Sequence, residues 1–275
     1  MALFFIASGA VYDRCLKAGK YDKISNLFLK KSKRLLYPFV LFCFAIATHV
    51  WYFTRADLES TYDEVFFDTI TCENGQYLWF LAVLFLCFMC VRLLEQSVRH
   101  KGIIMTLLLF LSFVKIDVEI IRRLFMYLPW FYCGRLFYNK IDWNRYAKWL
   151  AGLFPLFLAT YFFYNKLGMS ANIKYTYFML MSMLACLSTI GTACLLERCK
   201  LSGYAISRII NYGFEIYLLS CPIQIIYFHF EKQMFEVWHF NAFVSVLFFL
   251  VQILLTLFIC VLCAPFVRKV ITWND

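Results

Sequence analysis

The sequence predicts an all-α membrane protein, a polytopic bundle of transmembrane helices. Of its 275 residues, 63% are hydrophobic and only 16% are charged, and the mean hydropathy is +0.70. Soluble domains are about 45–50% apolar and about 25% charged, so this chain has too little polar surface for water. Disorder requires low hydrophobicity and high charge, and it is excluded as well. Because no long polar stretch separates the apolar ones, we expect a single transmembrane domain over residues 1–275.

About nine membrane segments are expected, since a helix needs roughly 20 apolar residues to cross the hydrocarbon core. Met1–Tyr12 is apolar but too short, and it lacks the basic stretch that opens a signal peptide, so we interpret it as the second half of an N-terminally truncated segment. The eight complete segments are Leu35–Thr54, Tyr77–Leu94, Ile103–Val114, Leu124–Tyr138, Trp149–Tyr164, Tyr177–Leu196, Phe214–Phe230 and Ala242–Val267.

The distribution of basic residues predicts the orientation of the bundle. If the connecting segments alternate sides, 20 of the 27 lysines and arginines fall on one side and seven on the other. The basic side is cytoplasmic by the positive-inside rule. The acidic stretch 55–76 then lies outside, and we expect a multi-pass protein of the inner (plasma) membrane.

Composition also argues against several other kinds of site. A net charge of +10 without a recognition module does not indicate nucleic acid, because cytoplasmic loops of membrane proteins account for it. Nine of the 12 cysteines lie in apolar runs, where free thiols pack as small hydrophobes. No metal-ligand spacing and no bound cofactor are predicted. The four histidines are dispersed, at His49, His100, His229 and His239.

Two segments are less easily explained as packing alone. Lys30–Pro38 is a basic cluster before an apolar helix; it is either an ordinary flank attracted to anionic lipid or a phosphate-binding site. Asn211–Pro222 places Glu215 at the mouth of an apolar helix, where an ionisable group usually faces protein or water. Arg135, inside a predicted membrane segment, either reaches the interface or pairs with a carboxylate.

Four stretches, in order along the chain, resemble the membrane acyltransferase family called acyltransferase 3, which O-acylates sugars. Met1–Gly9 looks like the Phe-Phe-x-x-Ser-Gly helix of that family. Lys30–Pro38 resembles its Arg-x-x-Arg motif, with Lys31 and Arg34 at the two basic positions. Leu78–Leu81 resembles its Trp-Phe-Leu motif, and Tyr212–Pro222 its Ser-x-x-Ile-Tyr-Leu-x-His segment.

The resemblance implies a donor site and a cleft. The acyl donor would be a cytoplasmic acyl-CoA, acetyl-CoA in the first instance, bound by Lys31 and Arg34. The acceptor would be a sugar hydroxyl of a cell-surface or exopolysaccharide. The residues that the resemblance places along the cleft are Trp79, Glu215, Tyr217 and Ser220.

The sequence also departs from the family pattern. The helix that carries the family's proposed histidine base would precede Met1, and Ser220 and Gly213 stand where the ninth-helix pattern has histidine and serine. On this ground we expect the chain as written to lack the proposed base and to be inactive by itself. Two other functions stay open at this point, a non-catalytic membrane scaffold and a polysaccharide transporter or flippase.

Overall fold

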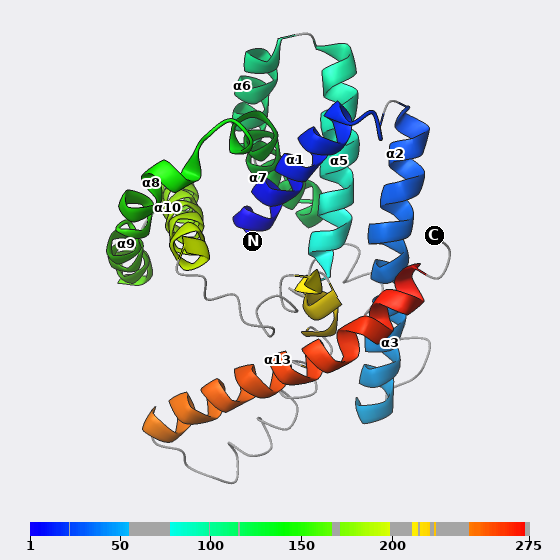
Figure 1. Cartoon of the computed structure of the whole chain (residues 1–275), viewed down its shortest axis with the longest axis vertical. Helices are drawn as coiled ribbons and strands as arrows, with labels where there is room; N and C mark the ends of the chain where they lie inside the picture. Colours follow the sequence, from blue (N-terminus) through cyan, green and yellow to red (C-terminus); the bar gives the residue numbers. More distant parts are fainter. Residues whose placement is uncertain are drawn as a thin grey trace. The chain divides into compact units, whose positions relative to one another are not determined.

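The computed structural model describes residues 1–21, 23–54, 78–98, 100–114, 116–166, 171–198, 211–213, 215–220, 223 and 242–272. These residues form helices and the turns between them, with no strand in the described ranges (Figure 1). The helices are α1 (Ala2–Lys17), α2 (Ile24–Lys31), η1 (Ser32–Leu36), α3 (Tyr37–Thr54), α5 (Trp79–Ser97), α6 (Lys101–Leu111), α7 (Glu119–Cys133), η2 (Gly134–Tyr138), α8 (Trp143–Ala151), α9 (Phe154–Lys166), α10 (Ala171–Arg198) and α13 (Ala242–Thr272).

The helices divide into two compact units. The first unit comprises Met1–Asp22, Cys90–Val114 and Phe125–Gly203, and the second comprises Lys23–Met89, Lys115–Leu124 and Tyr204–Asp275. The prediction of one domain over the whole chain stays a prediction.

Several helices suit a membrane by length and composition. Three of them are long and apolar enough to cross it, namely Trp79–Ser97, Thr176–Arg198 and Val251–Lys269. A fourth crossing is formed if Trp143–Ala151 and Phe154–Phe163, bent by 48° at their junction, act as one broken span. The described residues therefore confirm the helical class and supply three or four spans. The larger number of about nine stays a prediction, and most of Phe214–Phe230 lies outside the described residues.

One predicted segment has a different form in the structure. Trp149–Tyr164 was expected as a continuous helix, but α8 ends at Ala151 and α9 begins at Phe154. The reason is local, because Pro155 has no N–H to donate and its ring would collide with the carbonyl of Ala151 if the helix continued. At the second position of a new helix neither property matters. Gly152 ends α8, with its N–H donating to the carbonyl of Lys148 over 3.0 Å.

Helices of the first unit approach one another through glycine. A Cβ on Gly9 of α1 would collide with the carbonyl oxygen of Phe131, and it would lie 2.9 Å from the backbone nitrogen of Arg135. A Cβ on Gly134 would lie 2.7 Å from the Cα of Ile6. The two glycines thus let the backbones of α1 and of the α7–η2 helix touch. Contacts between small residues of this kind are typical of helix pairs in membranes, where lipid supplies no hydrophobic drive.

A similar approach joins α8 to α10 in the same unit. A Cβ on Gly191 of α10 would lie 2.6 Å from the Cβ of Leu150 and 2.8 Å from its carbonyl carbon. Ala147 is fully buried at this contact, whereas Trp149 on the other side of α8 is 82% exposed. Helix α8 therefore turns one narrow face to α10 and leaves its aromatic face uncovered.

The second unit holds a long helical rod and the first part of α5. Helices α2, η1 and α3 follow one another without a break from Ile24 to Thr54, so the basic cluster lies on a helix that begins well before Leu35 (Figure 1). Phe28 of α2 packs edge-on against Phe85 of α5, with ring centroids 5.7 Å apart. Leu78 and Leu81 are fully buried at the start of α5.

Candidate functional site

The two basic residues of the Lys30–Pro38 motif lie in different surroundings. Lys31 is only 7% exposed, and its ammonium nitrogen lies 3.8 Å from the ring centroid of Phe88. Arg34 is exposed. The cause is η1, a π-helical turn over Ser32–Leu36, whose wider turn rotates Arg34 away from the direction of Lys31. An Arg three residues after Lys31 would share its face in an ordinary α-helix.

Helix α5 carries the partners of several predicted site residues along its first part. Phe88 covers Lys31, and Phe80 meets the ring of Tyr217 edge-on at 5.3 Å. Trp79 stands beside Phe80 at the start of the helix. Three of the six predicted residues, Lys31, Trp79 and Tyr217, are therefore on α5 or in contact with it. This part of α5 is therefore in contact with two other segments that carry predicted site residues of the second unit.

Trp79 is held by two charged residues that the sequence analysis did not single out. Its ring is covered by the guanidinium of Arg123, 4.4 Å from the centroid, and Arg123 donates to Glu119 over 2.8 Å. Partial burial raises the pKa of Glu119, but hydrogen bonds from Arg123 and Arg122 outweigh it and hold that pKa below its usual value. Glu119 is therefore an ionised anchor for Arg123, and Trp79 is only 7% exposed.

Glu215 forms an ion pair that likewise had no sequence signal. Arg268 of α13 donates from Nε to Oε1 over 2.7 Å and from Nη2 to Oε2 over 3.0 Å. The same guanidinium lies 4.2 Å from the ring centroid of Tyr212 and donates to the carbonyl of Asn211. Arg268 follows 53 residues after Glu215, a separation that no local pattern reveals. A carboxylate held in this two-point manner is fixed in orientation.

The remaining candidates are placed more simply. The hydroxyl of Ser220 donates to the carbonyl of Tyr217 over 2.8 Å, a bond within its own helical turn. His100 is exposed at the start of α6. His229 and His239 lie outside the described residues, as does the side chain of His49.

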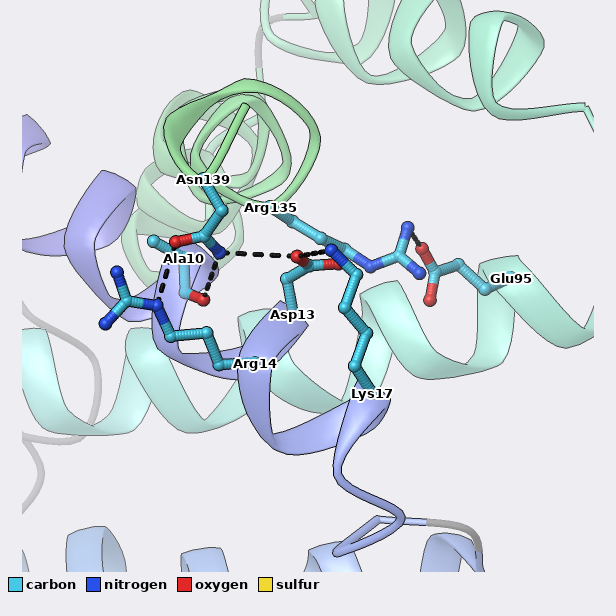
Figure 2. A network of polar contacts seen from close by, with 7 residues as sticks. All are labelled: Ala10, Asp13, Arg14, Lys17, Glu95, Arg135 and Asn139. Atoms are coloured by element: carbon cyan, nitrogen blue, oxygen red, sulfur yellow. Dashed lines mark hydrogen bonds and ion pairs between the residues drawn. The ribbon is translucent and has the colours of Figure 1, made fainter. Parts of the chain in front are cut away.

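The first unit contains a second polar centre, shown in Figure 2. Arg135 of η2 is 8% exposed and forms an ion pair with Glu95 at the end of α5. Of the two alternatives left open for Arg135, the structure therefore shows pairing. The rings of Tyr12 and Tyr132 each lie 5.8 Å from its guanidinium carbon.

Asn139 connects this centre to α1. Its amide donates to the carbonyl of Ala10 over 2.9 Å and to Asp13 over 3.3 Å, and its oxygen accepts from Arg14 over 2.9 Å (Figure 2). Lys17 donates to the same carboxylate over 2.7 Å. Burial raises the pKa of Asp13, but the hydrogen bonds from Lys17 and Asn139 outweigh it and keep that pKa below its usual value.

Comparison with known families decides the identity of the chain. The family model of the acyltransferase domain known as acyltransferase 3 matches residues 1–265. The chain belongs to the acyltransferase 3 family. The match covers both units, so this membrane acyltransferase contains the family's domain over nearly its whole length. No curated protein and no solved structure matches the chain.

All six residues predicted for the site of this acyltransferase belong to the second unit. Within it, α5 joins Lys31, Trp79 and Tyr217, whereas Glu215 is bound to α13 by Arg268. The arrangement offers an exposed cation at Arg34, a buried one at Lys31 and a fixed carboxylate at Glu215. In the described ranges, no group of His, Cys, Asp and Glu side chains is arranged to hold a metal ion.

Proposed function

We propose that this acyltransferase moves an acyl group, acetyl in the first instance, from acyl-CoA to a sugar hydroxyl of a cell-surface or exopolysaccharide. It does so as a multi-pass protein of the inner (plasma) membrane. The observation that carries the proposal is the acyltransferase domain over residues 1–265, which includes the basic motif at Lys31 and Arg34. In the transfer the hydroxyl oxygen bonds to the thioester carbon, the carbon–sulfur bond breaks, the CoA thiolate leaves, and the hydroxyl proton passes to a base. Because the family's proposed histidine is absent from the motif positions of this chain, a chain that acts by itself needs another residue to take this proton, with His49 and His229 the first candidates.

The chemistry of the donor supports roles for the two basic residues. Coenzyme A is polyanionic, and the exposed guanidinium of Arg34 matches a phosphate with two parallel hydrogen bonds. Lys31 is held against Phe88, so it supplies a positive charge at a fixed place. We assign Arg34 to direct contact with the phosphates of coenzyme A, and Lys31 to electrostatic attraction of those phosphates without direct contact.

The test measures transfer of radiolabelled acetyl from acetyl-CoA into polysaccharide by membranes that contain the protein. Label that mild alkali releases is an O-ester. We expect Arg34→Gln to raise KM for acetyl-CoA by about 10-fold or more, since charge-assisted hydrogen bonds contribute about 1.5–3 kcal/mol. Arg34→Lys should be intermediate because it keeps the charge but loses the fork.

Lys33→Gln is the matched control, because Lys33 is an exposed cation one residue away on the same π-helical turn. Its KM should stay within about twofold of wild type, as expected for a surface charge. Equal effects of Arg34→Gln and Lys33→Gln would remove the role of Arg34 and leave the activity standing. Absence of label in polysaccharide with the stable wild-type protein would refute the activity of the chain by itself, in agreement with the absence of the family's proposed base, and would favour a scaffold.

A further inference from the structure

The polar centre of the first unit has no role in the proposed donor site, and its chemistry is distinctive. We call it the Arg135 site, made of Arg135, Glu95, Arg92, Tyr12 and Tyr132. Arg135 and the carboxylate of Glu95 are about nine-tenths buried, with side-chain exposures of 8% and 10%. Tyr12 and Tyr132 are fully buried. These side chains come from α1, α5 and the α7–η2 helix.

Three buried atoms of this site have no hydrogen-bond partner among the described residues. They are the Nε of Arg135, the hydroxyl of Tyr132 and the Oε2 of Glu95. Buried polar atoms are nearly always hydrogen-bonded to protein, water or a ligand, so each one needs a partner here. Two of the three, the Nε of Arg135 and the hydroxyl of Tyr132, are donors, and the ring of Tyr132 lies 5.8 Å from the guanidinium carbon of Arg135. The site is therefore built for a polar occupant.

The charges of the surroundings indicate the sign of that occupant. The charge of Arg92 acts on Arg135, and Arg92 also lies beside the hydroxyl of Tyr12. The guanidinium groups of Arg135 and Arg92 thus repel one another, and Glu95 is the carboxylate that forms an ion pair with Arg135. Asp13, the next carboxylate, is already held by Lys17 and Asn139. A buried excess of positive charge is costly unless an anion neutralises it.

We propose that the Arg135 site binds a phosphate group. A guanidinium binds phosphate through two parallel hydrogen bonds, and tyrosine hydroxyls donate further ones. Glu95 would occupy the guanidinium in the empty state and compete with the phosphate for it. The exposed cations Arg14 and Lys17, at the same end of α1, attract an approaching anion. The phosphate comes either from coenzyme A or from a phospholipid headgroup; only the first source rests on the proposed function.

The competition by Glu95 makes the proposal testable with two opposite substitutions. The purified full chain is placed in phosphatidylcholine nanodiscs and titrated with inorganic phosphate or with coenzyme A while the thermal unfolding midpoint is followed. Arg135→Gln should weaken phosphate binding about 10-fold or more, because it removes the charged fork. Glu95→Gln should strengthen it several-fold, because it removes the competing carboxylate. Lys148→Gln, an exposed cation of the same unit, should leave the binding unchanged.

A second set of measurements, with an anionic lipid, distinguishes the two sources of the phosphate. Nanodiscs that contain phosphatidylglycerol should stabilise wild type, but not Arg135→Gln, if a headgroup is the occupant; in that case coenzyme A adds nothing. The proposal is overturned if Glu95→Gln weakens binding as Arg135→Gln does, or if no probe raises the midpoint of wild type. Either result would leave a purely structural ion pair.

The proposed function can fail separately. If the wild-type protein does not label polysaccharide, but Arg135→Gln and Glu95→Gln shift the phosphate affinity in opposite directions, the acyl-transfer assignment is refuted and the phosphate site stands. If labelling depends on Arg34 but neither Arg135→Gln nor Glu95→Gln changes phosphate binding, the acyl-transfer assignment stands and the phosphate site is refuted.

Discussion

Asn139 donates its side-chain amide to the backbone carbonyl of Ala10 over 2.9 Å. The two residues are 129 positions apart, and they join the end of η2 to α1 just beyond the Gly9–Gly134 crossing. Ala10 lies inside α1, so its carbonyl oxygen, which has two lone pairs, accepts the amide of Asn139 in addition to the hydrogen bond of the helix. The crossing and this hydrogen bond together hold Arg135 in place.

Asn139→Asp should destabilise the first unit by about 1–3 kcal/mol. The substitution keeps an acceptor for Arg14 but removes the donor to Ala10 and sets a negative charge beside Asp13. Thermal unfolding in detergent measures the effect. Asn144→Asp on the exposed face of α8 is the control, and it should shift the midpoint little. Equal shifts in the two variants would contradict a role for the Asn139 contacts.

Gly9→Ala and Gly134→Ala should each cost about 1–3 kcal/mol, since a methyl group has no room against the facing backbone. Gly102→Ala in α6 is a matched control, because nothing lies within 4 Å of its added Cβ. It should be neutral or stabilising by up to about 1 kcal/mol, as alanine favours the helix. The midpoints of the three variants rank the sites directly, and a destabilised Gly102→Ala would disprove the argument from space.

Stability should depend on pH through Asp13. Its pKa is lowered in the folded chain, so its contribution is present above the unfolded pKa of about 3.9 and is lost as pH falls through the lower folded value. The difference in midpoint between wild type and Asp13→Asn should therefore be constant from about pH 5 to pH 7 and shrink below about pH 4. A difference that instead grows on acidification would mean that the folded pKa is raised.

Arg268→Gln should destabilise the protein by about 2 kcal/mol, because it leaves the buried carboxylate of Glu215 without its partner. The value is reduced from that of a fully buried pair, since Arg268 is 39% exposed. Glu215→Gln combined with Arg268→Gln should cost less than the sum of the single changes. Lys269→Gln, the exposed neighbour, serves as control. Strict additivity in this double-mutant cycle would show that the two side chains act independently.

The sequence predicted the helical membrane class well because apolar composition reports it without any knowledge of contacts. It also predicted the family, through short motifs whose residues keep their order. It did not predict the contacts between individual side chains. The π-helical turn that separates Arg34 from Lys31 depends on one extra residue in a turn, which leaves no mark in hydropathy. The helix break before Pro155 could have been predicted from the sequence, since Gly152 and Pro155 are turn signals in an apolar run.

Partners of the charged residues could not be predicted for a different reason. Arg268 follows Glu215 by 53 residues, and the two meet only because α13 returns to that helical turn. Arg135 is anomalous in its apolar sequence surroundings, but Glu95 lies near the end of another helix, α5, and has no spacing relation to it. The motif glycine Gly9 had an evident partner only in the structure, where Gly134 lies opposite.

The crossing of α1 with η2 also sets an order of events during synthesis. Ala10 leaves the ribosome 129 residues before Asn139, which at about 5–20 residues per second is a delay of roughly 6 to 26 seconds. During this interval Gly134 has not been synthesised, so the backbone of α1 at Gly9 is in contact with lipid or with the insertion machinery and not with the α7–η2 helix. Helix α1 therefore forms this crossing well after its own synthesis, and a chain whose translation stops before residue 134 cannot form the crossing at all.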